Sequence, residues 1–197
     1  LRSEQGFEAP YGPTTAGRGH KNFMTEHPEH ECLWNGPSWP FATTQTLHAL
    51  ANVLKDYRQD YVTKQDFDMM FSRYTHSHYR VDENGKRINW LDENLDPFTG
   101  EWLSRKILEN WEWREEKGGY ERGKDYNHSA YADLVISRIF GVEPQEDGTV
   151  RIRPMIPDSW EYCRLSGLNC QGRELSICMD RTGDTYGKRG MQIRWED

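Results

Sequence analysis

Residues 129–152, SAYADLVISRIFGVEPQEDGTVRI, hold a change of hydrophobic period that decides the fold class. Before Gly141 the apolar residues recur every three or four positions, which predicts a helix over about 129–140. After Gly141 apolar and polar residues alternate, as Val150 and Ile152 do around Arg151, which predicts strands. The sequence therefore predicts a helical part over 1–141 and a small β region over 142–197.

The same helical period predicts three more helices upstream: one from about Thr43, one over about 63–78 with Thr63 as its N-cap, and one over about 101–113. Residues 1–42 are rich in Gly and Pro, which predicts that they form a loop. Further strands are predicted by alternation downstream, around 175–179 and 191–195. We expect a mainly α fold, with the β region packing on the helices or completing a sheet begun elsewhere in the protein.

Composition excludes several classes of protein. Among the 197 residues, 13% are aromatic, which argues against wholesale disorder, and no apolar run is long enough for a membrane span. The net charge of −7 argues against a nucleic-acid partner. The chain lacks an initiator Met and a signal pattern, so we expect a processed or partial chain. The compartment is unknown from sequence, with a soluble periplasmic or secreted protein favoured over a cytoplasmic one.

The four cysteines include no C-x-x-C pair, which favours free thiols over a dense disulfide framework, with one disulfide among the three late cysteines as the alternative. His27, His30 and Cys32 match no established metal-site spacing. We therefore expect neither a metal nor a cofactor.

The loop NWLDENLDPFTG, residues 89–100, carries three carboxylates within five positions, flanked by Trp90 and Phe98. Aromatic neighbours desolvate a carboxylate, which tunes it as an acid or a base, and their faces also stack on sugar rings. The alternative interpretation is a surface turn, in which Asp96-Pro97 and Thr99-Gly100 simply shape the backbone.

Two other loops contain candidate binding residues. CLWNGPSWPF, residues 32–41, forms either an aromatic-walled site or a loop whose Trp34 and Trp39 belong to the core. GKDYNHS, residues 123–129, mixes donors and acceptors suited to hydroxyl groups, or else it caps the following helix.

Together the three loops resemble those of (α/α)6-barrel glycoside hydrolases of the trehalase-like and glucosidase I-like (family 63) clan. Residues 34–40 resemble its tryptophan-glycine-proline loop, and residues 92–100 resemble its E-N-Y-D-P-x-T-G segment. Residues 125–130 fall where those enzymes have an aromatic-tryptophan-serine sequence before the last barrel helix. The closest resemblance is to the mannosylglycerate hydrolase-like group, over roughly residues 5–195. It implies that residues 1–141 form the C-terminal part of a partial (α/α)6 toroid, followed by the β region.

The resemblance implies an inverting glycosidase in which Glu93 is the general base and the general acid lies upstream of this chain. The isolated chain is then expected to be poorly active, and its partners are a carbohydrate substrate and the missing N-terminal part of the protein. Asn35 and Leu95 depart from the Arg and Tyr usual in such enzymes. The substrate-binding residues it implies are Trp34, Asn35, Gly36, Trp39, Trp90, Asp92, Tyr126, Asn127 and His128. The alternative is a non-catalytic carbohydrate-binding or structural module.

In a toroid of helices, the loops that precede the helices lie at the same end and approach one another. We therefore expect five rings to surround one pocket. These are the rings of Trp34, Trp39, Trp90, Tyr126 and His128.

Overall fold

The computed structural model describes residues 2–27, 30–110 and 121–196. The chain forms two compact units, Leu1–Tyr131 and Ala132–Asp197. The first unit contains α1 (Pro40–Asp56), α2 (Lys64–Ser77), β1 (Tyr79–Val81), β2 (Arg87–Asn89), α3 (Leu103–Asn110) and the start of α4 (His128–Leu134). The second contains the π-helical turn η2 (Val135–Ile139), β3 (Val142–Pro144), β4 (Val150–Ile152), β5 (Tyr162–Cys170), β6 (Arg173–Asp180) and β7 (Gly190–Glu196). The predicted domain boundary between residues 141 and 142 stays a prediction.

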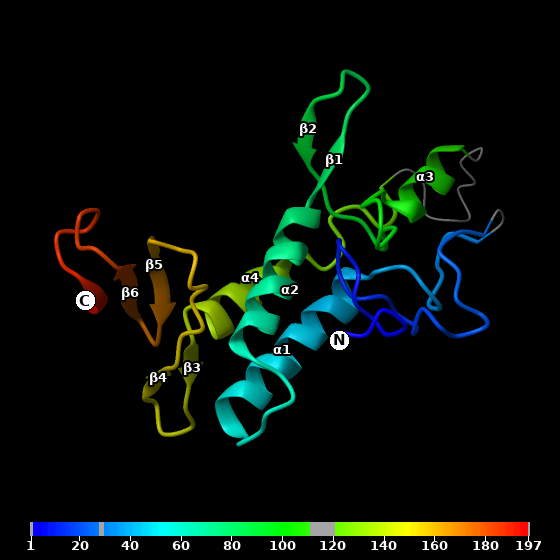
Figure 1. The fold of residues 1–197 in the computed structure, drawn as a ribbon. Helices are drawn as coiled ribbons and strands as arrows, with labels where there is room; N and C mark the ends of the chain where they lie inside the picture. The colour runs from blue at the N-terminus through cyan, green and yellow to red at the C-terminus, as the bar shows by residue number, and fades with distance from the viewer. Residues whose placement is uncertain (1, 28–29, 111–120, 197) are drawn as a thin grey trace. The chain divides into compact units, whose positions relative to one another are not determined.

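Helices α1 and α2 lie side by side in the first unit (Figure 1). α1 begins at Pro40, which suits the first helical position because the N–H that proline lacks would have no partner there. A buried hydrogen bond of 3.0 Å between the hydroxyl groups of Thr44 and Tyr74 joins the two helices. Their buried apolar residues follow the predicted stripes, so both helices confirm the prediction. These residues include Leu47, Leu50, Ala51, Phe67, Met70, Phe71 and Tyr74.

The start of α2 is fixed by its predicted N-cap, Thr63. The carboxylate of Asp66 accepts a hydrogen bond of 2.7 Å from the Thr63 N–H and one of 2.8 Å from its hydroxyl group. Arg2 donates to the same carboxylate at 2.7 Å through Nε. The hydrogen bond from Arg2, followed by those from Thr63, holds the pKa of Asp66 well below its usual range.

Asp66→Asn is expected to lower the free energy of unfolding by about 1 kcal/mol at pH 7, a typical value for a lost helix cap. Because the pKa of Asp66 is depressed in the folded state, its stabilisation is present above the unfolded pKa of about 4 and is lost as the pH falls through the folded pKa. The wild-type and variant stabilities should therefore converge in acid. Urea unfolding at pH 7 and pH 3 measures this, with the exposed Asp60→Asn as control. A constant gap at both pH values would contradict the prediction.

A small antiparallel hairpin, which the sequence patterns do not predict, follows α2. β1 pairs with β2, with Tyr79 opposite Asn89. The Asn84-Gly85 turn joins them, and Gly85 has a φ of 76°, which glycine adopts without a steric penalty. The hairpin extends away from the end of α2 (Figure 1). Its strands of three residues each are too short for an alternating pattern to be recognised.

In the second unit, β5, β6 and β7 form an antiparallel sheet with β6 at its centre. Leu175 and Ile177 of β6 are fully buried. β3 and β4 form a separate hairpin. The strands predicted at 150–152, 175–179 and 191–195 are therefore confirmed as parts of β4, β6 and β7.

The prediction of a mainly α fold, a partial (α/α)6 toroid followed by a small β region, is wrong. The described part of the chain has four α-helices and three small sheets, and 27% of it is helical. Within the described residues α3 and α4 comprise eight and seven residues, and α4 passes into η2. Residues 111–113 of the third predicted helix lie outside the described residues. Within the ranges that the structure covers, no helix has the length and apolar character needed to cross a membrane.

Candidate active site

The three loops singled out in the sequence meet in the first unit. We call them the first loop (31–39), the second loop (91–102) and the third loop (121–127). Ser38 and Leu95 exchange two main-chain hydrogen bonds of 2.9 Å, which pair the first loop with the second. The Asp125 N–H donates to the Leu91 carbonyl oxygen at 2.8 Å, which pairs the third loop with the second. Backbone hydrogen bonds thus hold both the first and the third loop against the second.

A buried ion pair fixes the second loop. Arg105 Nε donates to Asp92 Oδ2 at 2.7 Å, and the two side chains are 2% and 0% exposed. Trp90 Nε1 donates to the same oxygen at 3.2 Å. The other oxygen accepts from the Glu93 N–H at 3.0 Å and from the Ser104 hydroxyl at 3.4 Å. The Asp92 carboxylate therefore accepts hydrogen bonds from four donors, and this network positions the neighbouring residue Glu93. The substrate contact predicted for Asp92 stays a prediction.

The sequence-based prediction of the site did not include Arg105, although the sequence carries a signal for it. It lies three residues from both Trp102 and Leu108, which are buried, so the spacing places it on the inward face of α3. A charge on such a face needs a partner. Arg105 also donates to the Arg122 carbonyl oxygen at 2.8 Å, and so it ties the third loop to Asp92.

The side chain of Glu93 is half-buried where the three loops meet. Cys32 Sγ donates to Glu93 Oε2 at 3.0 Å. A Cβ added at Gly123 would lie 3.0 Å from Glu93 Cγ, so the third loop passes directly against this side chain. Burial, and then the charge of Glu93, raises the pKa of Tyr126. Glu93 therefore lies among Cys32, Gly123 and Tyr126.

A stack of aromatic rings lies next to the carboxylate of Glu93. The rings of Trp34 and Trp39 are stacked with centroids 4.0 Å apart, and Tyr126 meets Trp39 edge-on at 6.2 Å. Trp39 is 4% exposed and donates from Nε1 to the Leu33 carbonyl oxygen at 2.7 Å, as a core residue does. Trp34 is 52% exposed and presents an open ring. The core alternative thus holds for Trp39, whereas a binding role of Trp34 stays a prediction.

Other predicted binding residues shape the loops. Asn35 Nδ2 donates to the Asn22 carbonyl oxygen at 2.7 Å. Gly36 is buried against the main chain of Met24, where a Cβ would lie only 1.9 Å from the carbonyl oxygen. Asn127 donates to the Thr44 hydroxyl at 3.4 Å. The side chain of His128 lies outside the described part of the structure. Substrate contacts by these residues stay predictions.

Trp90 faces a different part of the unit from Trp34. The Arg80 guanidinium lies 4.2 Å from the centroid of the Trp90 ring. Trp90 lines a hollow of about 460 Å³ together with His78 and Tyr131, whereas Trp34 lines another. The geometry therefore does not place Trp90 with Trp34, Trp39 and Tyr126 around one pocket.

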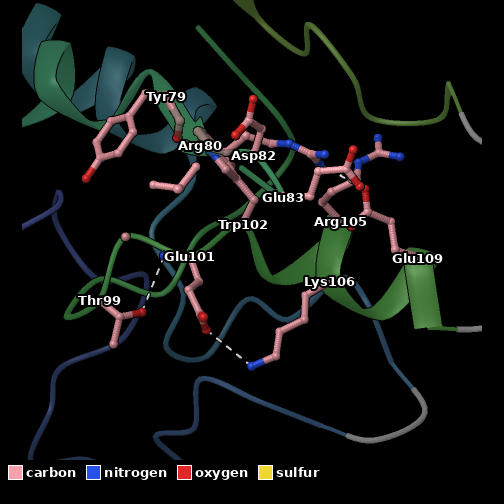
Figure 2. Close-up of a pocket in the computed structure, with 12 residues that line it drawn as sticks. Tyr79, Arg80, Asp82, Glu83, Thr99, Glu101, Trp102, Arg105, Lys106 and Glu109 are labelled. Atoms are coloured by element: carbon pink, nitrogen blue, oxygen red, sulfur yellow. Dashed lines mark hydrogen bonds and ion pairs between the residues drawn. The ribbon is translucent and has the colours of Figure 1, made fainter. Parts of the chain in front are cut away.

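A larger hollow of about 680 Å³ lies between the β1–β2 hairpin and α3 (Figure 2). Four of its charged side chains form two ion pairs: Arg80 with Glu109 at 2.8 Å, and Lys106 with Glu101 at 3.2 Å. Glu93 and the aromatic stack do not line it. We place the candidate active site at Glu93 and not in this hollow, because a half-buried carboxylate beside an open aromatic face suits glycoside chemistry better than paired surface charges.

Gly123→Ala is expected to destabilise the protein more than a Gly→Ala change at another left-handed position. Gly123 has a φ of 75°, and an added Cβ would lie 2.7 Å from the buried Asp92 Oδ1. Gly172 has a φ of 84° but nothing within 4 Å, so Gly172→Ala isolates the backbone cost of about 1–2 kcal/mol. Thermal unfolding of both variants compares them. Equal losses would show that the third loop does not pass against Asp92.

Residues 1–129, which include all three loops, match the family described as the mannosylglycerate hydrolase MGH1-like glycoside hydrolase domain. The chain is also similar to a solved structure named sialidase, with 35% sequence identity and a TM-score of 0.79. That similarity covers 98% of this chain and 16% of the sialidase chain, so the chain spans a small part of that protein's length. The fold and the loops thus define a glycoside hydrolase domain. The chain belongs to the mannosylglycerate hydrolase MGH1-like family, which confirms the resemblance.

Proposed function

We propose that the protein is a glycoside hydrolase in which Glu93 acts as the general base of an inverting hydrolysis. The observation that carries the proposal is the placement of Glu93, half-buried between Cys32 and Gly123 and next to the stack of Trp34, Trp39 and Tyr126. The family match supports glycosidase chemistry in these loops.

The chemistry requires a carboxylate that takes a proton from water while the water oxygen attacks the anomeric carbon. The glycosidic C–O bond breaks on the opposite face of the sugar, and an acid protonates the leaving oxygen. Half-burial leaves Glu93 accessible to a water molecule while its environment remains partly desolvated. The open ring of Trp34 offers a face on which a sugar ring stacks.

An inverting site needs its acid about 6.5–9.5 Å from the base. Asp92 and Glu31 are two of the carboxylates in the loops, next in sequence to Glu93 and to Cys32, and both are buried and paired with arginine. Donors surround the Asp92 carboxylate, which suits it poorly to the delivery of a proton. We propose that the general acid comes from another part of the full-length protein.

The substrate class that the family description suggests is mannosylglycerate. The test incubates the full-length protein with mannosylglycerate and, because of the sialidase similarity, with a panel of sialosides. Time-resolved proton NMR then reads the anomer of the first sugar released. Release with inverted configuration supports the proposal, and release with retained configuration rejects the inverting mechanism. Calorimetric binding of the sugar without hydrolysis would instead favour the non-catalytic carbohydrate-binding module.

A further inference from the structure

A chain of polar contacts runs from the interior to the carboxylate of Glu93. Arg122 Nη1 donates to Glu31 Oε1 at 2.6 Å, and the Glu31 side chain is 7% exposed. Arg122 Nη2 donates to Cys32 Sγ at 3.6 Å. Cys32 Sγ in turn donates to Glu93 Oε2 at 3.0 Å. The contacts connect all three loops through side chains.

The direction of these hydrogen bonds is fixed by chemistry. Guanidinium groups only donate, so the sulfur of Cys32 accepts from Arg122. Burial raises the pKa of the Cys32 thiol to about 12, and the hydrogen bond to Glu93 acts in the same direction. The thiol therefore keeps its proton at neutral pH and points it at Glu93 Oε2.

The main chain of Glu31 and of Arg122, the first two residues in this series of polar contacts, is itself hydrogen-bonded to buried side chains near Glu93. The Glu31 carbonyl oxygen accepts from Asn94 Nδ2 at 2.9 Å, and Asn94 is fully buried. The Arg122 carbonyl oxygen accepts from Arg105 Nη2 at 2.8 Å. Neither end can shift without disturbing buried groups, so the contact to Glu93 is built into the fold.

We propose that Arg122 and Cys32 are positioning residues that hold Oε2 of Glu93 and aim the other carboxylate oxygen at the attacking water. This inference rests on the proposed function. It assigns a role to the thiol that depends on its proton and not on nucleophilicity.

Activity of the full-length protein on mannosylglycerate tests the role through the pH profile of kcat/KM. Cys32→Ala removes a donor to the carboxylate, which favours the protonated base, so the acid limb should move up by about one pH unit. Cys32→Ser keeps a donor and should restore most of the wild-type profile. Arg122→Lys keeps the charge but loses the forked contact, and it should give a smaller shift in the same direction. A wild-type acid limb in Cys32→Ala would overturn the proposal.

A second measurement needs no substrate. Iodoacetamide alkylation of the 197-residue chain at pH 9, read by peptide mass spectrometry, compares Cys32 with the other free cysteines, Cys163, Cys170 and Cys178. Glu93→Gln removes a charge that raises the pKa of Cys32, so this residue alone should alkylate several-fold faster. An unchanged rate would show that the two side chains do not interact in solution.

The experiments distinguish a failure of the proposed function from a failure of the positioning role alone. If Glu93→Gln retains full turnover, the proposed function is wrong whatever the alkylation shows. If Glu93→Gln is inactive while Cys32→Ala keeps the wild-type pH profile, only the positioning role fails.

Discussion

Glu93→Gln in the full-length protein is expected to lower kcat by about 10²–10⁴-fold, the usual contribution of a general base. The amide has nearly the same shape but does not take a proton from water at neutral pH. Its oxygen can still accept from Cys32, whose sulfur lies 3.0 Å from Oε2 in the wild type. KM and the melting temperature should therefore change little. Steady-state kinetics and thermal unfolding of the purified variant measure all three quantities.

Asp96→Asn is the matched control from the same loop. Asp96 Oδ1 accepts from the N–H groups of Phe98 at 2.7 Å and Thr99 at 2.9 Å, which confirms the prediction that it forms a turn. Its substitution should act mainly through stability, with kcat of the folded protein retained. Near-normal kcat in Glu93→Gln, or a lost kcat in folded Asp96→Asn, would show that the base has been assigned to the wrong carboxylate.

The sequence predicts correctly those parts of the fold in which a hydrophobic pattern repeats over several turns or in which a residue marks where an element begins. α1 and α2 have apolar stripes over several turns, and Thr63 marks the start of α2. The central strand β6 alternates without interruption from Leu175 to Met179. In the two helices the local pattern agrees with the burial that tertiary packing imposes. In β6 the apolar residues Leu175 and Ile177 are buried as the alternation predicts, although Ser176 between them is buried as well.

The parts that were missed lack such agreement. β5 is interrupted by a bulge between Leu165 and Leu168, where Gly167 has a φ of 74°, and the bulge breaks the period of two. Because β5 and the β1–β2 hairpin were not recognised, the strand content was underestimated and the fold was predicted to be mainly α. Loops dense in tryptophan, glycine and carboxylates were recognisable in sequence, but their contacts were not.

Arg122 shows the limit of such reasoning about the site. It binds Glu31, which is 91 positions away in the sequence, and no local pattern specifies that partner. Its neighbour Gly123 signals a break in the chain but not that the third loop passes against Asp92 and Glu93. The roles of Arg122 and Arg105 become visible only when the loops are placed together.

Arg105→Met is expected to produce the largest loss of stability among the variants considered, about 3–5 kcal/mol. Arg105 and Asp92 are 2% and 0% exposed, so removal of the guanidinium leaves a carboxylate buried without its counter-ion. The three remaining donors, from Trp90, Glu93 and Ser104, keep hydrogen bonds but supply no positive charge. Urea unfolding at pH 7 measures the change.

Lys106→Met provides the control, because Lys106 is the next residue on α3 and is 49% exposed in its pairs with Glu101 and Glu26. Exposed pairs contribute about 0–1 kcal/mol, so this variant should be close to wild type. In the double variant Asp92→Leu with Arg105→Met, the buried charge is gone, yet the donors of Trp90 and Ser104 lose their acceptor. Its stability should therefore lie between that of Arg105→Met and wild type. If Arg105→Met were as mild as Lys106→Met, Asp92 would have to reach water in solution, and the rigid support inferred for Glu93 would be absent.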